Sequence, residues 1–364
     1  MTQPVRVLHC IACLETGGAE YQLFRLLQGL VPLGFSCHVV SLVRSGPLDE
    51  RIRELGVPVD FLDMRPGLPD PRGLWRFVRL LRRFRPHVLQ TWMYHSDVLG
   101  LLGRALGAPR LAWNIRCSNM DMGQYRPLTR VMLKLCARFS RVPDVVLTNS
   151  ESARDFHLGL GYRPREFQVI PNGIDVDSFR PDPAARLALR RELGLAEDAL
   201  LVGLVARVDP MKGHAVFCEA AGLAARRVPE ARFVLCGAGA TPENTELMDW
   251  LRRAGIADRA HLLGRRDDMM TVQAALDVGC SSSLFGEGFS NTVAEAMACG
   301  VPCAVTDVGD SAAIVADTGR VVPPGDAPAL AEALVSLRTL CHEDPEAWRR
   351  LGQAARERVV TRYS

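Results

Sequence analysis

The chain has 364 residues, of which 48% are hydrophobic and 23% charged, and its formal net charge is +3. This length exceeds what one hydrophobic core usually serves and suits two domains. No apolar run approaches the roughly 20 residues of a membrane-spanning helix. The first residues also lack the charged segment and cleavage site of a secretory signal, so we expect a cytoplasmic protein.

Short β-branched stretches alternate with helix-like ones through the first half of the chain. Gly17 and Gly18 separate the first expected strand from an amphipathic segment that runs from Ala19 to Leu30. Residues 168–179, QVIPNGIDVDSF, supply a last strand and a turn-rich exit. The other strands of this half are expected at residues 5–12, 37–43, 87–92, 110–115 and 144–150.

The same alternation restarts after this connector. It predicts an α/β protein of two parallel-sheet domains, residues 1–175 and 176–364. Ligands of such sheets bind beyond the carboxyl ends of the strands, so a cleft between the domains is the expected site. Strands are expected at 200–208, 231–239, 260–264, 277–283 and 302–309, helices near Gly213, Glu243, Asp267 and Asn291, and two more helices at 328–341 and 346–360.

The basic residues are distributed unevenly and are nearly all arginine. The first 180 residues carry 24 basic and 16 acidic side chains, whereas the remainder has an excess of acid. Such unlike halves suggest that the two domains face different partners. Only two of the 44 basic residues are lysines, Lys134 and Lys212, and a lysine in so arginine-rich a chain suggests a place for a compact ammonium group.

Eleven cysteines lie mostly in apolar stretches and are expected to be reduced core thiols. Cys10 and Cys13 form a single CxxC pair. No second pair and no histidine stands at the spacing of a zinc site. The sequence therefore predicts no metal site at this pair.

Cations and a helix start point to an anionic ligand in the second half. Arg207 ends the strand LLVGLVARV, and Lys212 follows five residues later, just before a helix. Two cations at the carboxyl end of a strand, with a helix N-terminus behind them, can hold a phosphate. Two solvated surface charges would give the same pattern.

The stretch FGEGFSNTVAE, residues 285–295, adds two carboxylates around a second helix start. Glu287 stands in a glycine-rich turn, and Glu295 falls inside the helix that begins at Asn291. Carboxylates accept hydrogen bonds from paired sugar hydroxyls, so the two acids could flank a nucleotide diphosphate, one toward each sugar. Alternatively, Glu287 is a solvated loop acid and Glu295 a charge on the helix surface.

The stretch ARVDPMKG, followed by FGEGFSNTVAEAMACGVPCAVTDVG, resembles the signature of retaining glycosyltransferases of family 4. That family has the GT-B fold, in which two Rossmann-like parallel-sheet domains face each other across a cleft. GGAE at 17–20 resembles its glycine loop, and VIPNGIDVDSF at 169–179 resembles its interdomain connector. The similarity extends over nearly the whole chain, with the motifs in the order and spacing of the family.

The resemblance implies a role for each of these residues. Glu287 would contact hydroxyls of the transferred sugar, and Glu295 would hold the nucleotide ribose. Arg207 and Lys212 would neutralise the departing diphosphate, so that catalysis is mainly electrostatic stabilisation of the leaving group. Backbone groups of Gly17, Gly18, Gly288, Phe289, Ser290, Asn291 and Thr292 would complete the donor site, with Arg265 near the base.

The resemblance also implies the substrates. The donor would be a UDP-sugar, or alternatively a GDP-sugar, and the acceptor a lipid-linked sugar or a polysaccharide of a bacterial surface glycan. No cofactor and no metal ion would be needed. Asp175 and Asp177 do spell the DxD metal motif of another glycosyltransferase fold, but their place in the connector favours a turn and cap role.

Three residues of the first half are candidates for the acceptor side. His95 lies in a stretch that resembles a segment of the family in which many members carry an active-site histidine, so the resemblance implies a catalytic role for His95. Gln90 and Trp92 replace two further histidines of that segment. A packing role for His95 is equally compatible with the sequence. Arg116 and Ser118 follow the next expected strand and would line the acceptor side.

Two basic segments, residues 72–85 and 126–141, mix arginines with bulky apolar residues. Arg126, Arg130, Lys134 and Arg138 are spaced four apart, which places them on one helix face. Such faces are often merely solvated, but an anionic membrane surface would attract them. We therefore expect peripheral contact with the inner face of the cell membrane. Nucleic acid is not expected as a partner, because the second half is acidic and no recognised motif is present.

Two alternatives remain, of which the first shares the fold and the donor site. A sugar-nucleotide epimerase would need no acceptor, and a scaffold subunit of a polysaccharide assembly would not need Lys212 or Glu287. A dehydrogenase is disfavoured, because Pro242 replaces the third glycine that GxGxxG would require. The resemblance further implies a final helix beyond Ser364 that crosses to the first domain. We expect that helix to be absent or truncated here.

Overall fold

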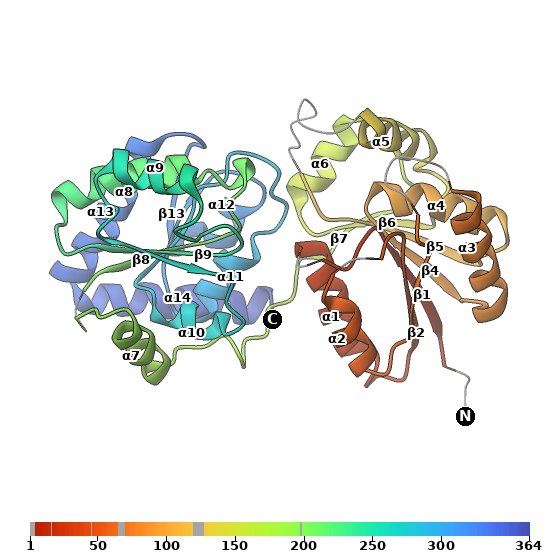
Figure 1. The fold of residues 1–364 in the computed structure, drawn as a ribbon, viewed down its shortest axis with the longest axis horizontal. Helices are drawn as coiled ribbons and strands as arrows, with labels where there is room; N and C mark the ends of the chain where they lie inside the picture. Colours follow the sequence, from red (N-terminus) through yellow and green to blue (C-terminus); the bar gives the residue numbers. More distant parts are fainter. Residues whose placement is uncertain (1–3, 16, 45, 65–69, 119–126, 197–198) are drawn as a thin grey trace. The chain divides into compact units, whose positions relative to one another are not determined.

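The computed structural model describes residues 4–15, 17–44, 46–64, 70–118, 127–196 and 199–364. They belong to two compact units, Met1–Pro171 and Asn172–Ser364. Each unit is a parallel β-sheet with helices against both of its faces (Figure 1). The prediction of two parallel-sheet α/β domains is confirmed.

The first unit contains a seven-stranded sheet of order β3-β2-β1-β4-β5-β6-β7. The strand order reverses between β1 and β4, which pair in parallel. Its strands are β1 (Arg6–Ile11), β2 (Ser36–Ser41), β3 (Val59–Phe61), β4 (Val88–Trp92), β5 (Arg110–Ile115), β6 (Val145–Thr148) and β7 (Phe167–Val169), and its helices are α1 (Gly18–Leu30), α2 (Leu48–Glu54), α3 (Pro71–Phe84), α4 (Tyr94–Ala105), α5 (Pro127–Phe139) and α6 (Glu151–Gly159).

The second unit contains a six-stranded sheet of order β10-β9-β8-β11-β12-β13, which reverses between β8 and β11. Its strands are β8 (Leu201–Val205), β9 (Arg232–Cys236), β10 (Ala260–Gly264), β11 (Val278–Ser281), β12 (Cys303–Thr306) and β13 (Arg320–Val322). Its helices are α7 (Pro183–Glu192), η1 (Pro210–Lys212), α8 (His214–Arg227), α9 (Thr245–Ala254), α10 (Met269–Ala275), α11 (Asn291–Ala298), α12 (Ser311–Val315), η2 (Ala316–Thr318), α13 (Ala327–Glu343) and α14 (Pro345–Arg362).

The two strands at the reversal of the second sheet are buried along their whole length. Every residue of β8 and of β11 is buried, because helices cover both faces of a parallel sheet and the strands then read as continuous apolar runs. The sequence analysis missed two edge strands, β3 and β13. Each has only three residues, which is too short for a periodic signal.

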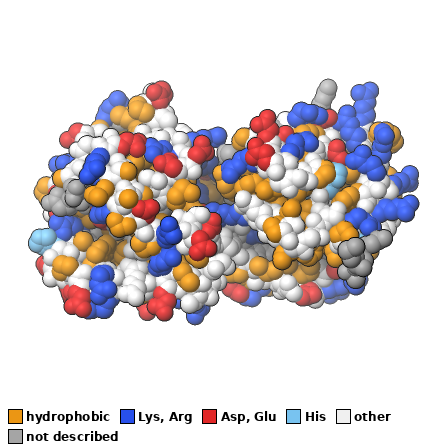
Figure 2. All heavy atoms as spheres, turned by 90° about the horizontal axis from the view of Figure 1, so that it is seen from below, with side chains coloured by type: hydrophobic (Ala, Val, Ile, Leu, Met, Phe, Trp, Pro, Cys, Tyr) orange, Lys and Arg blue, Asp and Glu red, His pale blue; other side chains and the backbone are white. Residues whose placement is uncertain are grey.

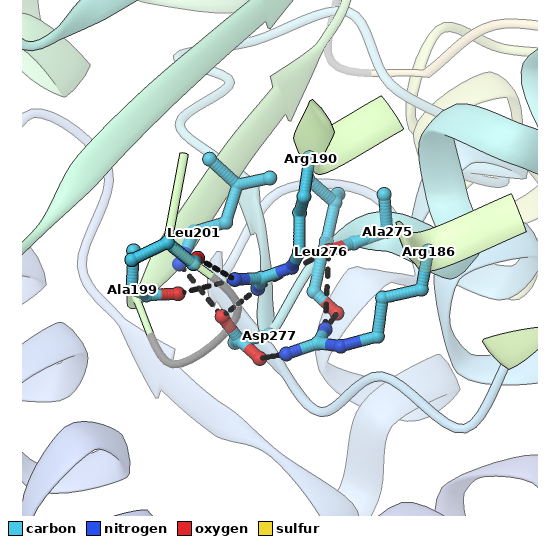
Figure 3. A network of polar contacts seen from close by, with 8 residues as sticks. Arg186, Arg190, Ala199, Leu201, Ala275, Leu276 and Asp277 are labelled. Atoms are coloured by element: carbon cyan, nitrogen blue, oxygen red, sulfur yellow. Dashed lines mark hydrogen bonds and ion pairs between the residues drawn. The ribbon is translucent and has the colours of Figure 1, made fainter. Parts of the chain in front are cut away.

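A buried ion cluster joins the amino ends of β8 and β11 (Figure 3). The Asp277 carboxylate pairs with Arg190 and with Arg186, both on α7, at 2.6 Å each. It also accepts a hydrogen bond from the backbone N–H of Leu201 at 2.7 Å, and Arg190 donates to the carbonyl of Ala199 at 2.6 Å. Arg190 is completely buried. The cluster therefore fixes α7 and both central strands at the end of the sheet opposite the strand carboxyl ends.

We predict that Asp277→Ala lowers the free energy of unfolding by roughly 3–5 kcal/mol, because it leaves the Arg190 charge buried without its carboxylate. Urea unfolding followed by circular dichroism measures the change. Asp249→Ala is the matched control, because Asp249 pairs with Arg252 on the exposed face of α9, where an ion pair contributes about 0–1 kcal/mol. Equal losses in the two variants would contradict the structural role of the cluster.

Candidate functional site

The segments that follow β8 and β11 lie against each other at the point where the strand order reverses. The Ser282 hydroxyl donates to the carbonyl of Lys212 at 2.9 Å, and the Leu284 N–H donates to the carbonyl of Met211 at 2.8 Å. Gly213 has a φ of +62°, and a Cβ there would lie 2.1 Å from the carbonyl oxygen of Ser282. Only glycine therefore allows this close approach.

Lys212 and Glu287 meet where the segments after β8 and β11 lie against each other, a contact that we call the junction. The Lys212 ammonium forms an ion pair with Glu287 Oε1. The Ser283 hydroxyl donates to the same oxygen at 3.0 Å. The Glu287 side chain is 10% exposed and that of Lys212 is 19% exposed. A carboxylate this buried needs such partners, because burying an unpaired charge is costly. The sequence placed both residues in one site but did not predict that they pair.

Arg207 lies nearer the surface of the same segment. Its Nε donates to Asp209 Oδ2 at 3.2 Å, and its side chain is 51% exposed. The other Asp209 oxygen accepts the Met211 N–H at 2.9 Å and so caps η1, which ends at Lys212. The two predicted cations thus share one segment, Lys212 inside the junction and Arg207 at its rim.

The glycine-rich turn leads directly into the N-terminus of α11, with Ser290 as N-cap. The Asp310 N–H donates to the carbonyl of Gly288 at 2.9 Å and holds the turn. Phe289 is buried, and its ring packs edge-on against Tyr363 with centroids 5.2 Å apart. Helix N-termini favour anions through their N–H groups and dipole. The junction therefore combines a cation, a helix N-terminus and a buried carboxylate.

Asn172 contacts the N-terminus of α11, and the sequence analysis did not identify it as a candidate. Its side-chain amide donates to the side-chain oxygen of Asn291, the first residue of α11, at 2.8 Å. The Gln273 amide similarly donates to the carbonyl of Thr292 at 3.1 Å. No sequence signal marks such pairs, because their members are 19 or 119 positions apart.

The remaining donor-side candidates lie elsewhere on the same unit. Glu295 is buried on α11, so it is not the helix-surface charge that the sequence left open. Arg265 is exposed and follows Gly264, the last residue of β10. Gly264 has a φ of +58°, and its carbonyl accepts the N–H of Gly237, which follows β9. Arg265 therefore stands at the carboxyl edge of the sheet.

The first unit has a corresponding reversal between β1 and β4. Gly17 and Gly18 form the N-terminus of α1 after β1, and His95 lies in the first turn of α4 after β4. Burial lowers the pKa of His95. Met93, the N-cap of α4, has a φ of +68°, an uncommon conformation for a side chain of this size. Gly17, Gly18 and His95 therefore lie at one edge of the first sheet, beyond the carboxyl ends of β1 and β4.

Arg116 and Ser118, the other acceptor candidates, follow β5. The Arg116 guanidinium lies over the ring of Trp92 at 5.1 Å, and burial lowers its pKa to about 10. Ser118 is fully buried, and its hydroxyl is 2.9 Å from that of Ser152 on α6. Its hydroxyl thus contacts α6 within the unit.

Two sets of polar contacts that the sequence did not reveal involve Tyr94 and Asp97, which lie with His95 in the first turn of α4. Asp97 is fully buried, and burial raises its pKa to about 7, although the Thr91 hydroxyl donates to it at 2.5 Å. The Tyr94 hydroxyl lies 2.7 Å from His157 Nε2, and His157 Nδ1 lies 2.6 Å from the carbonyl of Ala153. Because a carbonyl only accepts, Nδ1 carries the proton and Tyr94 donates to Nε2. These bonds fix the first turn of α4.

The basic helices differ in what their charges contact. On α3, Arg76 pairs with Asp63 at 2.7 Å and Arg83 with Asp60 at 3.2 Å. On α5, Lys134 and Arg138 are exposed, whereas Arg126 lies outside the described residues. Figure 2 shows Lys and Arg side chains gathered on the first unit.

The connector and the cysteines take structural roles. The Asp175 carboxylate accepts the N–H of Asp177 at 3.2 Å and both the N–H and hydroxyl of Ser178, so the predicted turn and cap role is confirmed. Eight of the eleven cysteines are buried free thiols, as expected.

Among the described residues, no group of three His, Cys, Asp or Glu side chains could hold a metal ion. Nor is any described helix long and apolar enough to cross a membrane.

Comparison with known proteins gives this architecture a family. The model of Glycosyltransferase Family 4 matches residues 16–178, and that of Glycosyl transferases group 1 matches residues 199–339. The two matches together span most of the chain, which belongs to the family-4 glycosyltransferases of the GT-B fold.

Curated relatives and solved structures cover nearly the same length. A D-inositol 3-phosphate glycosyltransferase of Kribbella flavida is 27% identical and covers 94% of this chain and 86% of its own. A UDP-Gal:alpha-D-GlcNAc-diphosphoundecaprenol alpha-1,3-galactosyltransferase of Escherichia coli is 27% identical, covering 80% and 77%. HepE of Anabaena in complex with UDP superposes with a TM-score of 0.83 at 22% identity, covering 99% and 96%, which shows a shared fold.

A third relative has a different donor in its name. The GDP-mannose-dependent alpha-(1-6)-phosphatidylinositol monomannoside mannosyltransferase of Mycolicibacterium smegmatis is 28% identical and covers 79% of this chain and 76% of its own. The names of these relatives thus include both a UDP-sugar and a GDP-sugar.

We predict that Gly213→Ala displaces Lys212 and weakens UDP binding by at least about tenfold, because the new Cβ would overlap the carbonyl of Ser282. Calorimetric titration with UDP measures this loss. Gly194→Ala is the matched control, since Gly194 has a φ of +65° but open space around its Cβ position. The control should lose about 1 kcal/mol of stability from backbone strain and keep its UDP affinity. Equal UDP affinity in the two variants would refute the role given to this contact.

Proposed function

We propose that this glycosyltransferase moves a hexose from a nucleotide diphosphate sugar, preferably a UDP-sugar, to a lipid-linked or polysaccharide acceptor with retention of the anomeric configuration. The observation that carries the proposal is the junction of Lys212, Glu287 and the α11 N-terminus where β8 and β11 separate. Ligands of open α/β sheets bind at such reversals.

The departing diphosphate is the group that this junction would stabilise. Lys212 and Arg207 supply positive charge, and the first turn of α11 supplies N–H groups and the positive end of its dipole. Interactions that are already in position when charge develops on the leaving group lower the barrier most effectively. Glu295 would hold the ribose and Arg265 would lie near the base.

Donor binding would change the partner of Lys212. In the structure the ammonium pairs with Glu287, and a diphosphate carries more negative charge than one carboxylate. The diphosphate would therefore compete for Lys212 and leave the Glu287 oxygens to accept hydrogen bonds from the sugar hydroxyls. In this scheme Ser283 keeps Glu287 in place during the exchange.

The first unit would hold the acceptor. The candidates for this role are His95, which lies at the carboxyl edge at the reversal between β1 and β4, and Arg116 and Ser118, which follow β5. The Escherichia coli relative is named for a diphosphoundecaprenol acceptor and the mycobacterial relative for a phosphatidylinositol mannoside. These names support a lipid-linked acceptor.

Such an acceptor would place the protein at the cytoplasmic face of a membrane. The segments 72–85 and 126–141 supply exposed cations together with exposed apolar side chains, including Trp75 on α3 and Val131 and Phe139 on α5. Each cation near an anionic surface contributes about 1 kcal/mol. Flotation of the protein with vesicles of anionic lipid measures this contact.

The reaction itself is tested with UDP-hexoses and GDP-mannose in the presence of EDTA. We expect turnover of a UDP-hexose without added metal, and NMR of the product should show the anomeric configuration of the donor. An inverted product would refute retention, and loss of turnover in EDTA would refute metal independence. Epimerisation of the donor without transfer to an acceptor would favour the epimerase alternative.

We predict opposite effects on UDP binding from the two members of the ion pair. Lys212→Ala should weaken UDP binding roughly 10–100-fold, because it removes a charge-assisted contact to the diphosphate. Glu287→Gln should bind UDP at least as tightly as the wild type, since the competing carboxylate is gone. Both should lose nearly all transfer activity. Calorimetry and a transfer assay separate the two effects.

Asp175→Ala is the control for this pair of variants. It removes the cap of the connector and should cost about 1 kcal/mol of stability while leaving transfer nearly normal. Near-normal transfer by Lys212→Ala would overturn the site assignment, and weakened UDP binding by Glu287→Gln would overturn the exchange of partners.

A further inference from the structure

A cavity of about 660 Å³ lies at the edge of the first sheet, beside β3 and α3. β3 is the edge strand and stands two strands away from β1 in the sheet order, so the cavity is separate from the reversal between β1 and β4. The volume falls within the range of small-molecule sites. Its lining residues are Arg44, Arg53, Val59, Asp60, Phe61, Leu62, Asp63, Trp75, Arg76, Arg79, Leu80 and Arg83.

The lining carries five guanidinium groups and two carboxylates, an excess of positive charge. Asp63 is shared by Arg44 at 3.1 Å and Arg76 at 2.7 Å. Asp60 is shared by Arg83 at 3.2 Å and the buried His38 ring at 2.9 Å. The two acids hold the arginines in place but do not neutralise them.

Arg53 and Arg79 have no ion pair with a carboxylate in the part of the chain that the structure describes. Arg53 donates to the carbonyl of Val59 at 2.6 Å, and the Arg79 guanidinium lies over the ring of Trp75 at 5.3 Å. A guanidinium has five N–H donors. Most of the N–H donors of Arg53 and Arg79 are therefore available to a ligand with several acceptor oxygens.

Protection of the edge strand explains only part of this arrangement. Arg53 and Arg76 donate to the carbonyls of Val59 and Leu62, which satisfies exposed groups at the sheet edge. It does not explain Arg79, which contacts Trp75 on its own helix. It also does not explain why the cavity gathers arginines from the β2 exit, α2 and α3.

We propose that this cavity binds a phosphate monoester or diphosphate group, with an apolar or flat part of the same ligand against Trp75. Paired guanidinium groups match phosphate oxygens bidentately, and Trp75 is 60% exposed beside them. The phosphate belongs either to a lipid headgroup or to a soluble phosphorylated compound. The site goes beyond the proposed transfer reaction, which does not depend on it, although its α3 residues belong to segment 72–85, which we proposed for membrane contact.

The experiment compares two double variants of the full chain that remove equal charge. Arg53→Gln/Arg79→Gln changes the cavity, whereas Arg72→Gln/Arg82→Gln changes exposed α3 arginines that do not line it. The soluble arm titrates inorganic pyrophosphate in saturating UDP, which occupies the donor site. The vesicle arm compares phosphatidic acid with phosphatidylglycerol at matched surface charge in phosphatidylcholine.

In the pyrophosphate arm, a soluble ligand predicts that the cavity variant binds about tenfold more weakly than wild type, and the control variant less than about twofold more weakly. In the vesicle arm, both double variants lose part of the general attraction of segment 72–85 to anionic lipid, so a lipid headgroup predicts that only the cavity variant also loses the preference for phosphatidic acid. In the vesicle arm, wild type should prefer phosphatidic acid. Arg79→Lys, which keeps the charge, should also weaken binding because it loses the bidentate geometry. The thermal unfolding of Arg79→Lys should match that of the wild type. Its hydrolysis of UDP-hexoses in the absence of membranes should also match.

Response in the pyrophosphate arm alone identifies a soluble ligand, and response in the vesicle arm alone identifies a lipid headgroup. Equal weakening of pyrophosphate binding by the two double variants, together with an unchanged preference of the cavity variant for phosphatidic acid, would show diffuse surface attraction and overturn the proposal. The proposal would also be overturned if the wild type bound neither pyrophosphate nor the vesicles, or if Arg79→Lys bound as tightly as the wild type. Lost hydrolysis by Lys212→Ala with intact cavity binding would leave this site independent of the donor site.

Discussion

The pairing of Lys212 with Glu287 is the constraint on which the second unit's site depends. A carboxylate with 10% of its side chain exposed is unstable unless it is paired and hydrogen-bonded. Lys212 and Ser283 meet that need. The same pair keeps an ammonium group inside the junction, where a diphosphate can replace the carboxylate as its partner. The site is thus assembled and nearly neutral before any ligand binds.

The fold holds this pair from both ends of two neighbouring strands. At the amino ends of β8 and β11, Asp277 connects Arg190 with the backbone of Leu201. At the carboxyl ends, Gly213 allows the Lys212 segment to lie on Ser282. These contacts act at opposite ends of the same pair of strands. The reversal of strand order then leaves the space between them open to a ligand.

Much of this was predictable because it depends on local pattern. The alternation of strands and helices predicted the two sheets, and the motif around Glu287 pointed to the candidate site. What the sequence did not reveal depends on pairing between distant positions: Lys212 with Glu287, and Asn172 with Asn291. β3 was missed because three residues carry no period. That omission hid the cavity, since the α3 arginines face β3 and its exit.

The two kinds of cation suit the two sites for different reasons. Lys212 enters a narrow junction with one compact charge, where three donors can turn toward whichever anion is present. The cavity beside β3 instead holds planar guanidinium groups fixed by Asp60 and Asp63, which suits the fixed geometry of phosphate oxygens. Rarity alone does not place a lysine in the donor site, because Lys134 is exposed on α5 of the first unit. Lys212 is distinguished by a buried carboxylate that has no other cation as its partner among the ion pairs of the described residues.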